Sequence, residues 1–216
     1  MARAGIADGE ELFVIPRDLV LSTRNSKLKD LLGQDLEELD PWLALILVMI
    51  YEYTLGDKSS WAAYLRIFPK DFDTLMFWSE PELRELQDSA VVDKIGKQSA
   101  EEEILEEIAP IIRHNPTLFP PIDGIPSYDG DAGTEAILKL AHTMGSLIMA
   151  YAFDLGKIDD EENKEGEDGY ITDEEDEEQL SKGMVPLADL LNADPDRNNV
   201  RHLFSNRLGC LSDGLS

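Results

Sequence analysis

The sequence predicts an α+β fold in which a small β-rich core carries a large helical region. A β-prone run at residues 11–16 lies near the start, and a short apolar segment at residues 185–191 lies near the end. Between them, from residue 22 to residue 155, the apolar residues follow mainly the helical period. We therefore expect both terminal runs to contribute to one small core, with the helices carried on it.

Composition limits the possible partners. The chain has 216 residues, 43% of them apolar, and a net charge of -26. This length allows one domain, or one domain with an insertion, and the apolar content is enough for a core. The charge argues against non-specific nucleic-acid binding, because phosphates would be repelled. It fits a basic protein partner, although solubility alone would explain it equally well.

Cysteine and histidine give no sign of a metal site. The single cysteine, Cys210, cannot form a disulfide within the chain, which favours a reducing compartment. The three histidines are far apart, and no Cys or His cluster has zinc spacing. The longest apolar run, residues 42–51, is too short to cross a bilayer, and no signal peptide is visible. We expect no metal, no membrane association and a location in the nucleus or cytoplasm.

Turn and capping residues divide the first half of the chain. The expected elements are a strand over residues 11–16, a helix from Ser22 to Leu32 ended by Gly33, a buried helix over residues 42–55 opened by Asp40 and Pro41, a short helix after Ser59, and a helix from the capping box at residues 79–82 to Leu86.

The second half begins with two longer helices and ends in an acidic stretch. Apolar spacing predicts one helix over residues 91–114, with its glutamates on a solvated face, and another over residues 135–153 that Thr134 caps. Residues 154–178 hold fourteen acidic residues, two lysines and few hydrophobic residues. This composition predicts a disordered acidic loop, which would either attract a basic protein or serve solubility.

The most specific string is residues 183–194, Gly-Met-Val-Pro-Leu-Ala-Asp-Leu-Leu-Asn-Ala-Asp. Pro186 interrupts an apolar run that carries two small polar residues, Asp189 and Asn192. The residues alone indicate a short buried segment that enters a turn, where Asp and Asn side chains usually satisfy backbone groups.

This string resembles the VPLADxxN signature of SET-domain protein-lysine N-methyltransferases, in the branch of the ribosomal-protein and Rubisco methyltransferases. Two further strings are similar to that branch: I-x-x-G-E-x-L-F-x-I-P from Ile6 to Pro16, and W-x-x-Y-L from Trp61 to Leu65. The resemblance covers residues 5–199 and implies a partial SET core with a large all-helical insertion.

The resemblance implies S-adenosyl-L-methionine as cofactor and a lysine of a basic ribosomal or nuclear protein as substrate. It makes Asn192, Ala193 and Tyr151 candidate cofactor-binding residues. Ala193 stands where the family usually has His, so a ring that packs beside the cofactor is missing. Trp61 is the candidate for the wall of the substrate channel. Plain packing in the core is the alternative for Trp61 and Tyr151.

The family also has segments that this chain lacks: a Gly-x-Gly segment before the first strand, and a later segment with the tyrosine of the lysine channel. We therefore expect a chain truncated at both ends, assign no catalytic residue, and predict weak or absent methylation. The alternative is a non-catalytic module that binds basic proteins through its acidic loop. The expected divisions are partial core strands at 1–21, a helical insert at 22–155, the acidic loop at 156–180, the cofactor turn at 181–200 and an atypical tail at 201–216.

Overall fold

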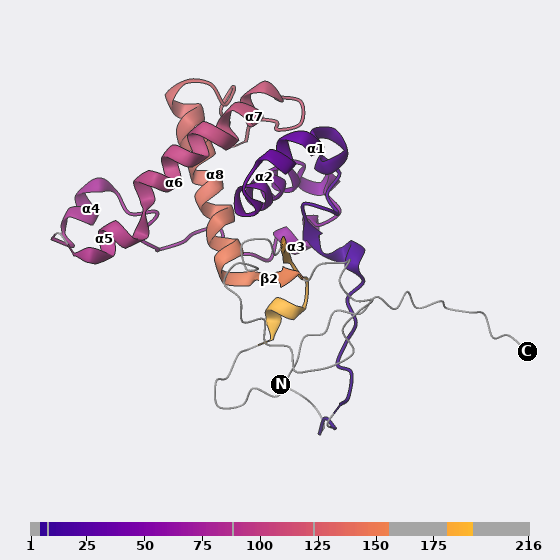
Figure 1. Ribbon diagram of the computed structural model, residues 1–216. Helices are drawn as coiled ribbons and strands as arrows, with labels where there is room; N and C mark the ends of the chain where they lie inside the picture. The colour runs from indigo at the N-terminus through magenta and orange to yellow at the C-terminus, as the bar shows by residue number, and fades with distance from the viewer. Residues whose placement is uncertain (1–4, 8, 88, 123, 156–180, 192–216) are drawn as a thin grey trace, which may run out of the picture.

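The computed structural model describes residues 5–7, 9–87, 89–122, 124–155 and 181–191. They form a helical body with a small three-stranded sheet at one end (Figure 1), which confirms the α+β prediction. The α-helices are α1 Leu28–Glu38, α2 Pro41–Thr54, α3 Ala62–Leu65, α4 Glu80–Arg84, α5 Ala90–Ile95, α6 Lys97–Glu103, α7 Ala109–His114 and α8 Gly130–Tyr151. The strands are β1 Leu21–Ser22, β2 Ala152–Leu155 and β3 Ser181–Met184. The predicted acidic loop and the predicted tail lie outside the described residues.

The centre of the body is the pair α2 and α8, which pack against each other. The Asp40 carboxylate accepts a hydrogen bond from the Trp42 N–H at 2.8 Å, and Pro41 occupies the first turn, so α2 begins where its capping signals predict. Every residue from Leu43 to Glu52 is buried. The all-round apolar pattern of this helix therefore reflects a position inside the main core.

One buried acid joins three elements at this core. The Glu52 carboxylate on α2 accepts hydrogen bonds from the hydroxyls of Ser26, at 2.7 Å, and Ser59, at 2.6 Å. Each hydroxyl in turn accepts a bond from a backbone N–H two residues later, at Leu28 and Trp61. Glu52 thus ties the starts of α1 and α3 to α2, and both of its oxygens have partners, as a buried carboxylate requires.

Two of the predicted helices start at different residues. Ser22 does not cap α1 but lies in β1, and α1 begins six residues later and continues past Gly33 with a kink at Leu32. Thr134 does not cap α8. Helix α8 starts at Gly130, directly after Asp129, so Thr134 lies inside the helix.

The long helix predicted over residues 91–114 is divided. Gly96 ends α5 with φ at +61°, a left-handed conformation that glycine adopts without strain, and α6 then starts in a new direction. A π-helical turn over Ile104–Ile108 separates α6 from α7. The apolar spacing continues through both interruptions, so the periodicity alone could not locate them.

The sheet has the strand order β1-β3-β2, with antiparallel neighbours throughout. Gly183 of the central strand lies opposite both Ser22 and Phe153. A Cβ atom at Gly183 would lie 2.7 Å from Leu155 Cδ1 and 2.9 Å from Val20 Cγ1, so these two side chains pack closely over the glycine and would have to shift for a larger residue. The predicted end of the α8 helix was wrong, since residues 152–155 form β2.

The strand predicted over residues 11–16 is also wrong. These residues belong to no helix or strand, and the side chains of Leu12, Phe13 and Val14 are exposed, Val14 to 69%. Within the described residues no neighbouring strand pairs with this run, and β-propensity alone does not form a ladder. Of the predicted core strands in residues 1–21, only Leu21 is in the sheet.

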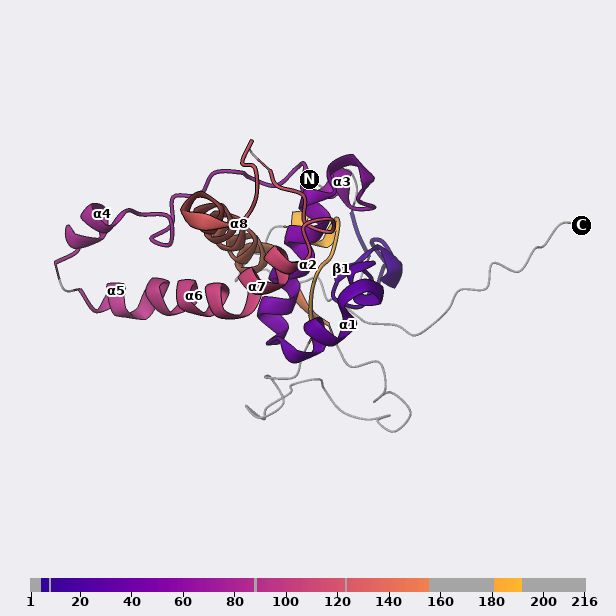
Figure 2. The ribbon, with the colours of Figure 1, turned by 90° about the horizontal axis from the view of Figure 1, so that it is seen from above.

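Helices α4 and α5 extend away from the body, and α6 leads back to it (Figures 1 and 2). The capping box is confirmed, because Glu82 accepts hydrogen bonds from the Ser79 hydroxyl and the Ser79 N–H, both at 2.7 Å. These bonds lower the pKa of Glu82. The predicted end of the helix is wrong, because α4 ends at Arg84 rather than Leu86.

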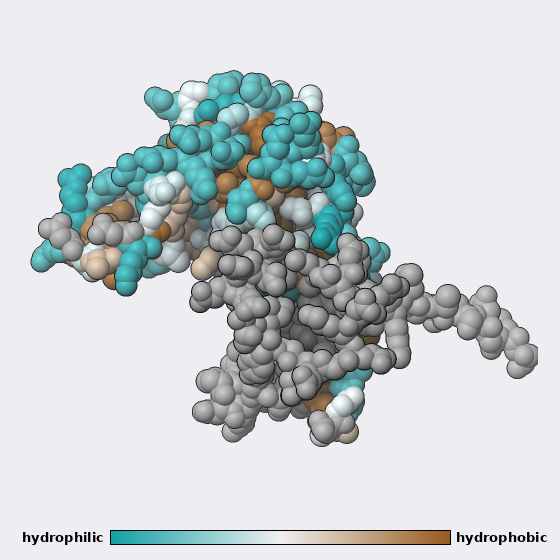
Figure 3. Space-filling view, in the orientation of Figure 1, coloured by the Kyte–Doolittle hydropathy of each residue, from teal (hydrophilic) through white to brown (hydrophobic). Residues whose placement is uncertain are grey.

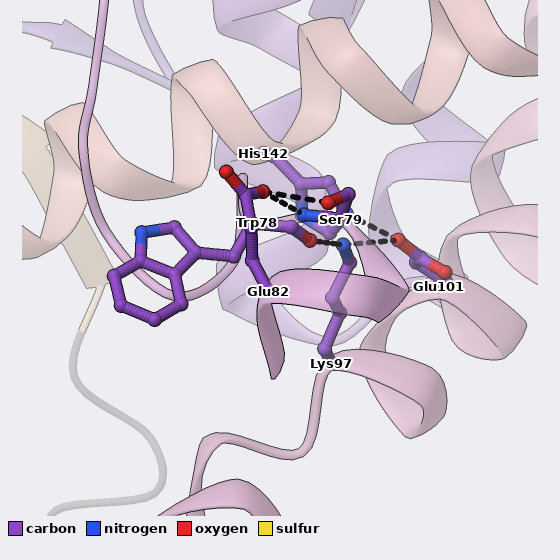
Figure 4. Close-up of polar contacts among 6 residues, drawn as sticks. All are labelled: Trp78, Ser79, Glu82, Lys97, Glu101 and His142. Carbon is purple, nitrogen blue, oxygen red and sulfur yellow. Dashed lines mark hydrogen bonds and ion pairs between the residues drawn. The ribbon is translucent and has the colours of Figure 1, made fainter. Parts of the chain in front are cut away.

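A polar cluster fastens this extension to α8 (Figure 4). The Lys97 ammonium donates to the Trp78 carbonyl at 2.7 Å and lies 3.9 Å from the Glu101 carboxylate. The same carboxylate lies 3.1 Å from Nε2 of His142, a buried residue of α8. The ring of His142 also meets Phe77 edge to face. The cluster thus joins α6, and the segment of Phe77 and Trp78 that precedes α4, to the body.

Hydrophilic side chains cover most of the helical body in the view of Figure 3. In the part of the chain that the structure describes, no helix has the length and apolar character needed to cross a membrane. In the same residues, no three His, Cys, Asp or Glu side chains are grouped so that they could hold a metal ion.

Candidate functional site

The turn at residues 185–191 follows β3 and packs against Val20, the residue that precedes β1. Val185 and Ala188 are buried with Val20 in a small apolar cluster separate from the main core. Leu187 has φ at +76°, which is strained for a residue with a side chain. Its side chain is 58% exposed. The segment is therefore a turn as predicted, but only partly buried.

A side-chain hydrogen bond between described residues connects this turn to the helices. The Tyr64 hydroxyl of α3 donates to Asp189 Oδ2 at 2.7 Å, across 125 positions of sequence. Burial raises the pKa of Tyr64, and the hydrogen bond to Asp189 and its negative charge raise it further. Asp189 Oδ1 is buried and accepts no hydrogen bond from the described residues. A buried carboxylate oxygen without a donor calls for an explanation at a candidate site.

Aromatic rings continue from this bond towards the end of α8. The Tyr64 and Phe68 ring centroids are 4.7 Å apart, and those of Phe68 and Tyr151 are 5.2 Å apart. Tyr151 is the last residue of α8 and is half-buried. The predicted site residue Tyr151 is thus brought to the same group of rings as Tyr64, which bonds the turn.

Trp61 lies deeper. Its side chain is 9% exposed, it belongs to the main core, and its indole N–H donates to the Leu19 carbonyl at 2.8 Å. These contacts agree with the packing alternative, and a role in a substrate channel stays a prediction. Asn192 and Ala193 lie outside the described residues, directly after Leu191. Their role in cofactor binding also stays a prediction.

Known proteins with similar sequences are lysine methyltransferases. Ribosomal lysine N-methyltransferase 4 of Saccharomyces cerevisiae is 34% identical over 207 residues, which are 93% of this chain and 40% of that protein. N-lysine methyltransferase setd6 of Xenopus laevis is 35% identical over 200 residues, 89% of this chain and 39% of that protein. The chain is homologous to protein-lysine N-methyltransferases. It spans about 40% of the length of these relatives. No family model matches it.

A solved structure supports this relationship. The structure of Rubisco LSMT bound to AdoMet superposes with a TM-score of 0.53 at 25% identity, covering 84% of this chain and 34% of that one. The resemblance to the ribosomal-protein and Rubisco methyltransferases, found in the strings at Ile6, Trp61 and Val185, is therefore confirmed.

Sequence reasoning missed Tyr64, the residue that bonds the candidate turn to α3. A signal was present, because Trp61 and Tyr64 are three residues apart and so lie on neighbouring positions of one helix face. The pairing with Asp189 is tertiary, and no local pattern connects residues so far apart. Asp189 itself stood out only as a small polar residue within an apolar run.

Proposed function

We propose that the chain forms part of an S-adenosylmethionine-dependent protein-lysine N-methyltransferase, and that the turn at residues 185–191, with Asn192 and Ala193 after it, contacts the cofactor. The observation that carries this proposal is 34% identity to a ribosomal lysine N-methyltransferase over 93% of the chain. The AdoMet-bound structural neighbour supports the choice of cofactor. We also propose that residues 22–155 are a helical insertion into a partial SET core.

The residues at the turn fit a ligand of this kind. A purine base suits half-buried aromatic rings such as that of Tyr151, and the ammonium of the cofactor's amino-acid end is a suitable donor for an acceptor such as Asp189 Oδ1. When bound, S-adenosylmethionine supplies the methyl group. The part of the protein in this chain would bind and orient it, because methyl transfer to an amine depends on alignment of the two reactants.

The proposed substrate is a lysine of a basic protein, ribosomal or nuclear, in the nucleus or cytoplasm. The net charge of -26 supports a basic partner, since opposite charges speed and select association. Trp61 remains the proposed residue of the channel wall. We predict that residues 1–216 methylate weakly by themselves. Cofactor binding does not depend on this activity and can be measured separately.

Photocrosslinking tests the proposal. Radiolabelled S-adenosylmethionine is irradiated with the purified chain, with and without excess unlabelled cofactor. We expect labelling that the unlabelled cofactor suppresses, that Asn192→Ala removes, and that a matched control in the acidic stretch, Asn163→Ala, retains. Labelling that persists under competition, or that is equal in both variants, would contradict the proposal. Transfer of label to lysines of basic proteins would then define the substrate class.

The net charge favours a second function, a non-catalytic module that binds basic proteins through residues 156–180. Deletion of residues 159–178 should then abolish binding to a lysine-rich protein and leave cofactor labelling unchanged. Unchanged affinity for that protein after the deletion would exclude this function.

A further inference from the structure

The candidate turn is connected to the main core through the Tyr64 hydroxyl, which donates to Asp189 Oδ2 at 2.7 Å. We propose that Tyr64 is a positioning residue that holds the 185–191 turn in register with α3. The link to cofactor binding rests on the proposed function, whereas the positioning of the turn itself does not.

Few other described contacts hold the turn. Its buried apolar side chains are Val185 and Ala188, while Leu187, Leu190 and Leu191 are exposed. The strain at Leu187, with φ at +76°, persists only where surrounding contacts impose it. The hydrogen bond from Tyr64 is therefore a polar contact that adds to the burial of Val185 and Ala188 in fixing the conformation of the turn.

Loss of the hydrogen bond between Tyr64 and Asp189 should also destabilise the turn. Asp189 Oδ1 is buried and receives no hydrogen bond from any described residue. Without Tyr64, the carboxylate would have no described side-chain partner at either oxygen. A half-buried carboxylate with a buried, unpaired oxygen is unfavourable, and movement of the turn towards water would relieve it.

Tyr64 is itself held rigidly, so it can transmit the geometry of the core. Its ring is buried and packs edge to face against Phe68. Helix α3 starts beside Ser59, whose hydroxyl is bonded both to Glu52 and to the Trp61 N–H. Hydrogen bonds thus fasten the start of α3 to α2, and Tyr64 extends from the same short helix to the turn.

The test compares Tyr64→Phe with Tyr51→Phe. The control also removes the hydroxyl of a buried tyrosine of the core, but that hydroxyl forms no described hydrogen bond. The first measurement is amide hydrogen exchange without any ligand. We expect Tyr64→Phe to speed exchange at residues 187–191 about tenfold, the effect of one lost hydrogen bond, with α2 and α8 unchanged. Tyr51→Phe should leave the turn unchanged.

The second measurement is the dissociation constant of S-adenosylmethionine, which we expect Tyr64→Phe to raise about tenfold and Tyr51→Phe to leave alone. Asp189→Asn keeps an acceptor for the Tyr64 hydroxyl, so the turn should exchange as slowly as in the parent. Slow exchange in this variant, with fast exchange in Tyr64→Phe, would show that the hydrogen bond controls exchange, rather than a general loss of stability.

Equal exchange in Tyr64→Phe and the parent would overturn the positioning role. Faster exchange in a chain whose parent form binds no cofactor would support the positioning role and reject the proposed function, so the two failures are distinguishable. Faster exchange with an unchanged dissociation constant would overturn the link between the turn and the cofactor.

Discussion

The contacts that stabilise the helical body differ from those that stabilise the turn at residues 185–191. In the body, α2 is buried over ten consecutive residues, and its one buried acid, Glu52, has hydroxyl partners at both oxygens. In the turn, two leucines are about 60% exposed, Leu187 at 58% and Leu190 at 63%, and a buried oxygen of Asp189 has no described donor. Among the described residues, the body therefore supplies partners for the carboxylate of Glu52, whereas the turn leaves one oxygen of Asp189 without a donor.

This difference indicates where stability and function reside. Elements with few buried apolar contacts open more easily than the core and are the usual source of ligand-binding segments. Local rules are also broken mainly at functional sites. Changes in the body should thus lower the free energy of unfolding, while changes at the turn should alter binding more than stability.

The largest effect should come from Gly133 in the first turns of α8. A Cβ atom there would lie 2.1 Å from the Tyr128 carbonyl carbon, which is backbone and cannot move aside. We expect Gly133→Ala to lower the free energy of unfolding by more than about 3 kcal/mol in urea denaturation. The control Gly145→Ala would place its Cβ atom at ordinary contact distance, 3.6 Å from Ile46 Cδ1 and 3.8 Å from a ring carbon of Trp42, and should be neutral or slightly stabilising. Equal losses in the two variants would show that α8 does not pack as described.

Removal of the buried acid should have the next largest effect. Glu52→Ala leaves the hydroxyls of Ser26 and Ser59 without their acceptor and creates a cavity. We expect a loss of about 3 kcal/mol in the same assay. The control is Glu107→Ala, because Glu107 is exposed in the π-helical turn after α6, and this change should alter stability by less than about 0.5 kcal/mol. If Glu52→Ala lost as little stability as the Glu107→Ala control, the hydrogen bonds of Glu52 would contribute little to the core.

Alkaline pH should act on the link between the two regions. The pKa of Tyr64 is raised above the ordinary tyrosine value of about 10 by burial and by Asp189. Its contribution is therefore fully present below pH ~10 and is lost as the pH rises further, by up to about 1.4 kcal/mol per pH unit. Tyr64→Phe should flatten this part of the stability profile. A profile above pH ~10 that is identical in the parent and in Tyr64→Phe would contradict the assigned environment.

The smallest effect should come from the cluster that fastens the α4–α6 extension. Glu101→Gln weakens the contacts of a partly exposed carboxylate with Lys97, which is also partly exposed, and with the buried His142. We expect a loss of less than about 1 kcal/mol, together with faster proteolysis between α4 and α5. Glu103→Gln, whose side chain is exposed on the same helix, is the control and should change neither. Unchanged proteolysis in Glu101→Gln would show that other contacts hold the extension.

Helices with local start signals could be predicted from the sequence. Asp40 and Pro41 identified the start of α2, and Ser79 with Glu82 identified the start of α4, because capping depends on residues within one turn. Strand β2 could not be predicted, since Ala152 pairs with Met184 of a distant segment. The same holds for residues 11–16, whose β-prone composition finds no partner strand in the described residues.

The candidate site was predictable only in part. The string from Val185 to Asn192 led to the family, and the relatives confirm it. Tyr151 was named as a site residue and lies among the rings beside α3. The bond between Tyr64 and Asp189 could not be predicted, because it depends on how α3 and the turn meet in three dimensions.

Calorimetric titration of S-adenosylmethionine into the purified chain shows whether the chain contains a cofactor site. We expect saturable binding of one cofactor per chain with a micromolar dissociation constant, and loss of that binding in Asn192→Ala. An absence of binding to a chain whose helical circular dichroism confirms that it is folded would contradict the proposed cofactor site.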